Sequence, residues 1–149
     1  MDIPPSVIEV LHSALQEDIG SGDITTSLVI PERSKSKGHF IAKEGFVLAW
    51  LPFALKAFQL LDPSIKSKVY HRDGTRVKKA NVICEISGKT QNILKGERVS
   101  LNILQRLSGI ATLTNIYAEK IIGSKTKIVD TRKTTPCLRF MEKYAVRIG

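Results

Sequence analysis

The sequence predicts an α+β fold, an antiparallel sheet with helices on one face, followed by a helix, a strand and a second helix at the C-terminal end. Short segments rich in β-branched and aromatic residues alternate in polarity between residues 39 and 86, which is typical of half-buried strands. Amphipathic segments with helical spacing lie before, among and after these strands. The connections are short and contain glycine or proline, which favours neighbouring elements packed in one layer.

A first helix is expected to begin at Pro4 and Pro5 and to end at Gly20. Proline is tolerated in the first turn because the N–H that it lacks has no partner within the helix. Glycine ends helices because it readily adopts a left-handed backbone. The apolar residues between them recur at helical spacing, namely Val7, Leu11, Ala14 and Leu15.

The next segment, residues 17–26, carries three acids and two glycines. We expect Asp23 to hold a turn through backbone N–H groups and Thr25 or Thr26 to open an extended segment. A cation-binding loop is the alternative interpretation, but the spacing does not fit a calcium loop.

The middle of the chain predicts four strands and a helix. Strands at 39–42 and 46–50 are separated by Lys43-Glu44-Gly45, which indicates a hairpin. An amphipathic helix follows at 52–61, and two more strands are expected at 64–70 and 82–86. His39 and His71 lie singly on strands, where a structural role is the usual one.

A long helix is predicted at 97–122. Its apolar stripe is wide enough to indicate burial on most of the helix circumference. Gly109 inside it marks a kink or a close contact. At its start Glu97 and Arg98 are adjacent in sequence, so the residues alone indicate a surface pair whose side chains do not face one another.

Residues 127–139 contain the pattern that points to a binding site. Residues 127–130 predict a short strand that must end before Pro136, and a helix bearing Leu138, Met141 and Ala145 on one side follows. Two cations and three hydroxyls lie between them: Thr131, Arg132, Lys133, Thr134 and Thr135. In α/β folds ligands bind where strands end, and guanidinium, ammonium and hydroxyl donors suit a carboxylate or a phosphate. Chemistry alone leaves solvated loop cations as the other interpretation.

Composition narrows the function classes. The 149 residues are 42% hydrophobic and 25% charged with a net charge of +9, as in a folded globular protein. Seven cations and two acids between Lys125 and Gly149 give a local +5, a field that favours small polyanions. Aromatic residues, at 6%, do not alternate with the basic ones, so nucleic acid is not the expected partner. Two cysteines that are far apart, without a histidine cluster, indicate a reduced, cytoplasmic setting and no cysteine-based metal site. No membrane span or secretory signal is expected from the sequence either.

Three separated motifs carry a resemblance to a known family. They are DTRKTTP at 130–136, followed by LR and EKYAV, EDIGSGDITT at 17–26, and ERVSLNILQRLSGIAT at 97–112. In this order they resemble quinolinate phosphoribosyltransferase, the carboxylating nicotinate-nucleotide pyrophosphorylase. The resemblance implies an N-terminal α+β domain at 1–112 and, at 113–149, the incomplete start of an α/β barrel of the phosphoribosyltransferase type. Because one strand cannot close a barrel, we expect the chain to be the front half of a longer enzyme and to be catalytically incomplete by itself.

The resemblance also implies an activity. Members transfer phosphoribosyl from phosphoribosyl pyrophosphate to quinolinate with Mg²⁺, releasing pyrophosphate and CO₂ and leaving nicotinate mononucleotide for NAD biosynthesis. Carried over by motif, Thr131 and Arg132 bind the substrate carboxylates and Lys133 faces the phosphates. Arg98 reaches the partner's site in a homodimer, and Arg139 and Lys143 match further substrate-binding positions. No catalytic acid or base is assigned, and the Mg²⁺ ligands are expected outside this chain.

Two departures and two alternatives accompany this interpretation. Cys137 stands where the family commonly has glycine, so it is strained if its φ is positive, and Trp50 stands where the family usually has a small residue. The alternatives are a sister family, nicotinate phosphoribosyltransferase or a molybdenum-transport-associated relative, and a non-catalytic dimerisation or binding fragment.

Overall fold

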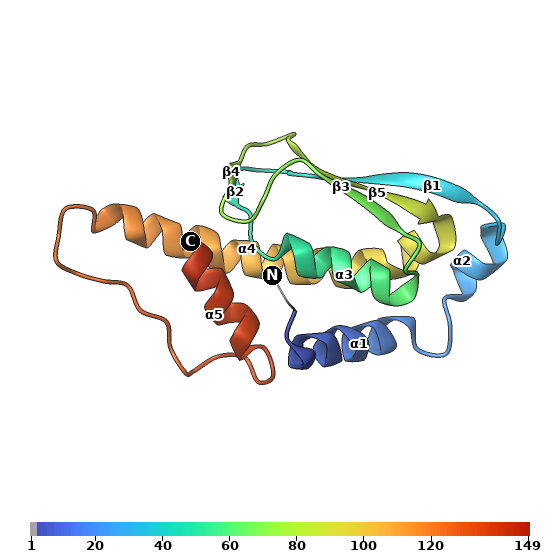
Figure 1. Cartoon of the computed structure of the whole chain (residues 1–149), viewed down its shortest axis with the longest axis horizontal. Coiled ribbons are helices and arrows are strands. Elements are labelled where there is room, and N and C mark those ends of the chain that lie inside the picture. Colours follow the sequence, from blue (N-terminus) through green and yellow to red (C-terminus); the bar gives the residue numbers. More distant parts are fainter. Residues whose placement is uncertain (1–2) are drawn as a thin grey trace.

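The structure, a computed structural model, describes residues 3–149. The helices are α1 (Pro5–Ile19), α2 (Ile24–Val29), α3 (Leu51–Leu61), α4 (Thr90–Lys120) and α5 (Arg139–Ile148), and the strands are β1 (Lys35–Ile41), β2 (Phe46–Val47), β3 (Lys66–Val69), β4 (Arg76–Val77) and β5 (Val82–Lys89). The strands lie above α3 and α4, α1 lies below them, and α5 crosses near the end of α4 (Figure 1). The predicted α+β layer is therefore confirmed.

The strands form two small antiparallel sheets, one in the order β1-β5-β3 and one that pairs β2 with β4. The predicted hairpin between residues 39–42 and 46–50 is wrong, because β1 pairs with β5 and β2 with β4. A register shift between Phe40 and Ile41 marks where the ladder ends. The next residue, Ala42, then bonds the loop before β5 through Asn81 and Ala80. A bulge of this kind bends the strand and separates the two sheets.

The segment after α1 also differs from the prediction. The predicted extended segment at Thr25 or Thr26 is the helix α2 instead. Asp23 is its N-cap, and the carboxylate accepts a hydrogen bond of 2.9 Å from the Thr26 backbone N–H. An aspartate at this position satisfies a helix N–H as readily as it holds a turn, so the same residue supports either structure. The predicted end of α1 at Gly20 is confirmed.

The core lies between the strands and α3, and α4 closes its other side. Its largest fully buried side chains include Trp50, Phe53, Phe58, Leu48 and Leu11. These residues form one continuous apolar cluster with the inward faces of β1 and β5. The hydrophobic effect therefore stabilises the layer through residues on four elements that are far apart in sequence.

Helix α4 packs through small residues that hydrophobic periodicity does not identify. Ser100 is buried and donates to the Ala54 carbonyl at 2.8 Å, and a Cβ on Gly96 would lie 2.6 Å from the Phe58 ring. The helix begins at Thr90 rather than at residue 97. The expected burial around most of its circumference is wrong, because Leu113 and Tyr117 are 55% and 56% exposed. Among residues 3–149 the exposed apolar side chains of α4 include Leu113, Ile116 and Tyr117, all in the second half of the helix.

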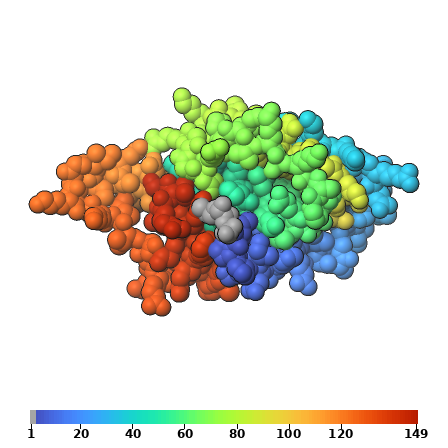
Figure 2. All heavy atoms as spheres, viewed as in Figure 1, coloured from blue at the N-terminus to red at the C-terminus, as the bar shows by residue number. Residues whose placement is uncertain are grey.

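Residues 121–138 are neither helix nor strand, so the strand predicted at 127–130 is wrong. Strands need a neighbour to accept and donate backbone hydrogen bonds, and within residues 3–149 no strand lies beside this segment. Val129 is 82% exposed as a result. Figure 2 shows the end of α4 and the residues that follow it, in orange, as a lobe that extends beyond the rest of the molecule.

One carboxylate joins the first layer to α5. Asp73, in the turn before β4, accepts hydrogen bonds from the backbone N–H groups of Trp50 and Leu51 at 2.9 and 3.0 Å. It also accepts one from the Tyr144 hydroxyl at 2.6 Å. Trp50 has a positive φ of 83° at the start of α3 and stacks on Phe53 with ring centroids 3.6 Å apart. The unusual tryptophan thus takes part in core packing.

We predict that Gly96→Ala and Gly109→Ala, the same change in the same helix, have opposite effects. A methyl group at residue 96 would press on the Phe58 ring, which costs about 1–3 kcal/mol of unfolding free energy. Nothing lies within 4 Å of a Cβ at residue 109, so alanine there gains helix propensity, about 0.5–1 kcal/mol. Urea unfolding of both variants measures the difference. Equal effects would contradict the close packing of α3 on α4.

Candidate functional site

The polar cluster at 130–135 is tied to α5 rather than to a sheet. Lys143 forms an ion pair with Asp130 at 3.0 Å. Arg139 approaches the Thr134 hydroxyl and the Arg132 carbonyl, both at 3.4 Å. Arg139 and Lys143 therefore contact the segment that carries the predicted site, and both point toward it from the first half of α5.

A stronger attachment runs through two residues that the sequence did not single out. Glu142 accepts hydrogen bonds from the Arg106 guanidinium at 2.6 Å and from the Thr135 N–H at 3.2 Å. Arg106 also donates to the Thr135 hydroxyl at 2.5 Å. One residue each of α4, α5 and the segment between them thus form a closed network. Charge-assisted hydrogen bonds of this kind are among the stronger ones in proteins.

The network also sets the charge of Glu142. Burial by itself would raise the pKa of this carboxyl, but the hydrogen bonds from Arg106 and Thr135 together outweigh burial and hold the pKa below its usual value. Glu142 is therefore ionised at neutral pH, as the ion pair with Arg106 requires.

Arg132 and Lys133 remain available to a ligand. Both side chains are exposed, and neither forms an ion pair with any acid in residues 3–149. Asp130, the nearest acid in sequence, forms its ion pair with Lys143 instead. The Thr131 hydroxyl accepts the Lys133 N–H at 3.1 Å, which fixes the local turn. The expected group of cations and hydroxyls is therefore present, but on an irregular segment instead of a strand end.

Arg98 lies apart from this cluster. It is on α4, and its exposed side chain pairs with Asp18 of α1 at 2.6 Å. Arg106, the residue of α4 that contacts Thr135, is roughly 12 Å further along the helix axis at 1.5 Å per residue. Within one chain Arg98 therefore does not join the residues around Arg132.

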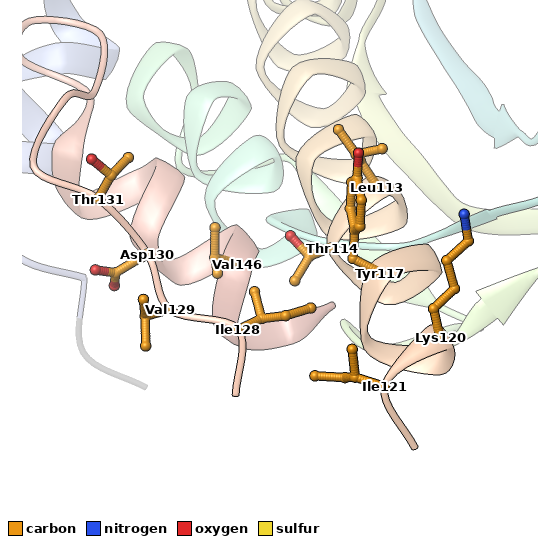
Figure 3. A pocket seen from close by; sticks show the side chains of 10 residues that line it. All are labelled: Leu113, Thr114, Tyr117, Lys120, Ile121, Ile128, Val129, Asp130, Thr131 and Val146. Carbon is orange, nitrogen blue, oxygen red and sulfur yellow. The ribbon is translucent and has the colours of Figure 1, made fainter. Parts of the chain in front are cut away.

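A cavity of about 500 Å³ lies between the end of α4 and the residues after it, but it is apolar. Figure 3 shows Ile128, Thr114 and Val146 pointing into it, whereas Asp130 and Thr131 turn their oxygens away. Of the described residues 3–149, Lys120 is the one cation that lines it. Arg132 and Lys133 are not among the residues that line this cavity.

Cys137 is exposed and has a positive φ of 64°, the left-handed conformation that favours glycine. The expected strain at this residue is therefore present. The turn it makes brings Leu138 to the start of α5.

Comparison with known proteins identifies the family. Residues 23–108 match the N-terminal domain of quinolinate phosphoribosyl transferase, and residues 110–149 match the C-terminal domain of the same family. The chain belongs to this family. The probable nicotinate-nucleotide pyrophosphorylase [carboxylating] of Synechocystis is 45% identical over 99% of this chain and 50% of its own length, and that of Bacillus subtilis is 42% identical over 95% and 48%. The resemblance read from the three motifs is confirmed.

Solved structures agree with the fold. The crystal structure of NadC from Streptococcus pyogenes has a TM-score of 0.95 at 39% identity, covering all of this chain and 53% of that one. The nicotinate-nucleotide pyrophosphorylase of Francisella tularensis has a TM-score of 0.92 at 38% identity. The chain thus spans about half the length of the relatives that it matches.

Residues 3–149 contain no group of three histidine, cysteine, aspartate or glutamate side chains that could hold a metal ion. The described residues therefore do not fit a magnesium site. That the Mg²⁺ ligands lie outside this chain stays a prediction.

We predict that acid releases the segment 130–135 from α5. Glu142 has a depressed pKa in the folded protein, so its contribution to stability is present above the ordinary carboxyl pKa and is lost as the pH falls through the lower, folded value. Exchange of the Thr135 amide hydrogen, corrected for its intrinsic rate, should speed up in that range. Glu142→Gln should exchange faster at neutral pH and lose the pH dependence. Glu119→Gln, which breaks the exposed pair with Arg76, is the control and should leave Thr135 unchanged.

Proposed function

We propose that the protein to which this chain belongs transfers phosphoribosyl from phosphoribosyl pyrophosphate to quinolinate with decarboxylation, giving nicotinate mononucleotide, pyrophosphate and CO₂ for NAD biosynthesis. The observation that carries the proposal is that Arg132 and Lys133 are exposed, form no ion pair with an acid among residues 3–149, and lie on a segment attached to α4 and α5 by the network around Thr135. The names of the relatives in Synechocystis and Bacillus subtilis support the same activity.

The chemistry of the reaction explains these residue types. A dicarboxylate must be taken out of water, which requires fixed guanidinium groups to replace its hydration. In this proposal Thr131 and Arg132 hold the carboxylates of quinolinate, and Lys133 faces the phosphates. Arg139 and Lys143 contribute through the same segment: each contacts it directly, so they orient the ligand-binding residues as well as add positive charge.

A second copy of the chain completes the proposed site. Arg98 lies roughly 12 Å along α4 from Arg106, the α4 residue that contacts the segment 130–135, and it is exposed on the α1 side. In a two-fold symmetric homodimer each subunit would donate its Arg98 to the other. Within its own chain the guanidinium donates to Asp18, so reaching the partner's site would require Arg98 to leave this pair.

The finer structural assignments belong to this proposal as well. We place a domain boundary at 112/113 and assign 113–149 to the start of an α/β barrel, although α4 runs without interruption across the boundary.

A cytoplasmic location stays a prediction; plant relatives are named mitochondrial or chloroplastic. No helix within residues 3–149 is both long and apolar enough to cross a membrane.

Product analysis tests the activity. Quinolinate or nicotinate is incubated with phosphoribosyl pyrophosphate and magnesium, using the 149-residue chain and any longer natural form of the protein. Nucleotide made from quinolinate alone, by the longer form, supports the proposal and the expectation that 149 residues are insufficient. Turnover of nicotinate would move the protein to the sister family, and inactivity of every form would leave a non-catalytic binding or dimerisation role.

In the active form, Arg132→Ala should lower kcat/KM for quinolinate by about 10- to 100-fold, because a hydrogen bond to a charged group is worth about 1.5–3 kcal/mol. Lys125→Ala removes a charge from the same exposed segment without touching the network and serves as the control. A variant Arg132→Ala with nearly unchanged turnover would show that the carboxylates bind elsewhere.

Arg98 is tested by mixing subunits. Arg98→Ala and Arg132→Ala homodimers should each be weakly active, because every site lacks one arginine. Hybrid dimers contain one site with both arginines if Arg98 acts across the interface, so mixing the two variants should restore activity. Mixing Arg132→Ala with a Lys133→Ala variant, which lies in the same site, should restore none. Absence of recovery with Arg98→Ala would place Arg98 in its own subunit's site.

A further inference from the structure

The outer face of the β1-β5-β3 sheet concentrates positive charge at the end of the molecule opposite the segment 121–138 (Figure 1). Strand register decides which residues meet there. Lys35 lies opposite Lys89, and Ser87 lies between Lys37 on one side and Lys66 on the other. Neighbouring strands are about 4.8 Å apart, so these four lysines project from a narrow, rigid frame.

The sheet does not neutralise this charge. Like charges directly opposite on antiparallel strands destabilise the pairing, and Lys35 with Lys89 is such a pair. Within residues 3–149 only Lys37 has an acid partner, Glu85 at 3.0 Å, and Glu85 is shared with His39 at 3.1 Å. Hydrogen bonds from Ser64 and Asn92, and then the charge of Lys89, lower the pKa of Asp62, so this carboxylate offsets part of the charge of Lys89 but not that of Lys35 or Lys66. An anion on this face would therefore remove a repulsion that the protein alone leaves in place.

The face is also hollow. A concavity of about 780 Å³ is lined by the four lysines (Lys35, Lys37, Lys66 and Lys89), three serines and Gly88, and no carboxylate from residues 3–149 lines it. The residues that line it between the lysines are small. Gly88 is required for packing on the core side of the sheet, since a Cβ there would lie 2.7 Å from the buried Ile65. Long cationic side chains around a floor of small hydroxyl residues form a site for an anion rather than for an apolar ligand.

We propose that this lysine hollow binds a compact oligophosphate, either free or as the phosphate chain of a nucleotide. Ammonium groups bind phosphates as point charges from several directions, and serine hydroxyls add hydrogen bonds. The volume is that of a small-molecule site. No aromatic side chain lines the hollow, so it lacks the stacking surface that a nucleic-acid strand would use. This assignment is independent of the proposed transferase activity.

The test measures binding of inorganic triphosphate, ATP and a short single-stranded oligonucleotide by calorimetry, at several salt concentrations. Binding of triphosphate should weaken as salt increases, and the amide resonances of Ser87 and Gly88 should shift in NMR spectra. If the affinity for ATP equals that for triphosphate, the phosphate chain is the recognised group. If the affinity for ATP is higher, the hollow is assigned to a nucleotide. Preference for the oligonucleotide, or shifts confined to residues 131–134, would overturn the proposal.

A matched pair of variants controls for general electrostatics. Lys66→Gln/Lys89→Gln should weaken triphosphate binding by at least about tenfold, since two charged contacts are lost. Lys78→Gln/Lys79→Gln removes the same charge from exposed residues outside the hollow. It should change the affinity for triphosphate less than about twofold. Equal losses in both would show nonspecific attraction and overturn the site.

Folding provides an independent check. Lys89→Gln removes the repulsion with Lys35 and also the attraction to Asp62, so the Tm of each variant without ligand is the reference for its own ligand-induced shift. Triphosphate should raise the Tm of the wild type but not of the double variant, because only a ligand that binds the folded state stabilises it. A wild-type Tm that triphosphate leaves unchanged would contradict the proposal.

Discussion

The carboxylate of Asp73 is the interaction on which the relative placement of the parts depends. It satisfies two N–H groups at the start of α3, which otherwise have no partner within the helix, and it binds Tyr144 of α5. Burial, and then the bond to Asp73, raises the pKa of the Tyr144 hydroxyl, so this donor keeps its proton. A single side chain in a surface turn therefore fixes both the core helix and the helix that supports the site.

Helix α5 packs on the core with one face and positions the segment 130–135 with the other. One face buries Met141, Tyr144 and Ala145 against the first layer. Within the same turns Arg139, Glu142 and Lys143 contact the segment 130–135. Because a helix places residues three and four apart on one side, anchoring the buried face sets the direction of the polar one. Arg106 of α4 completes the attachment by bonding Glu142 and Thr135 together. An irregular segment can thus present Arg132 and Lys133 without belonging to a sheet.

The errors in the sequence predictions have specific physical causes. Residues 127–130 have a strand's alternation, but alternation describes compatibility with a sheet and does not supply the neighbouring strand. The hairpin after β1 was expected from a short glycine-containing link, yet the bulge at Phe40 and Ile41 redirects the chain to β4 and β5. In α4 the buried contact uses Gly96 and Ser100, whose small size matters more than their hydrophobicity. Asp23 supports a turn and a helix cap through the same hydrogen bond.

The sequence by itself determined the α+β class, the positions of α1, α3 and α5, the family, and the group of cations and hydroxyls at 131–135. Local periodicity and contiguous motifs suffice for these, since they depend on residues close together in the chain. Only the tertiary structure decided that Glu142, Arg106 and Thr135 form one network, that Asp73 binds Tyr144, and that four lysines from three strands surround one hollow. Except for the bond between Thr135 and Glu142, these contacts join residues tens of positions apart, and such pairing is set by how the elements pack rather than by any pattern along the chain.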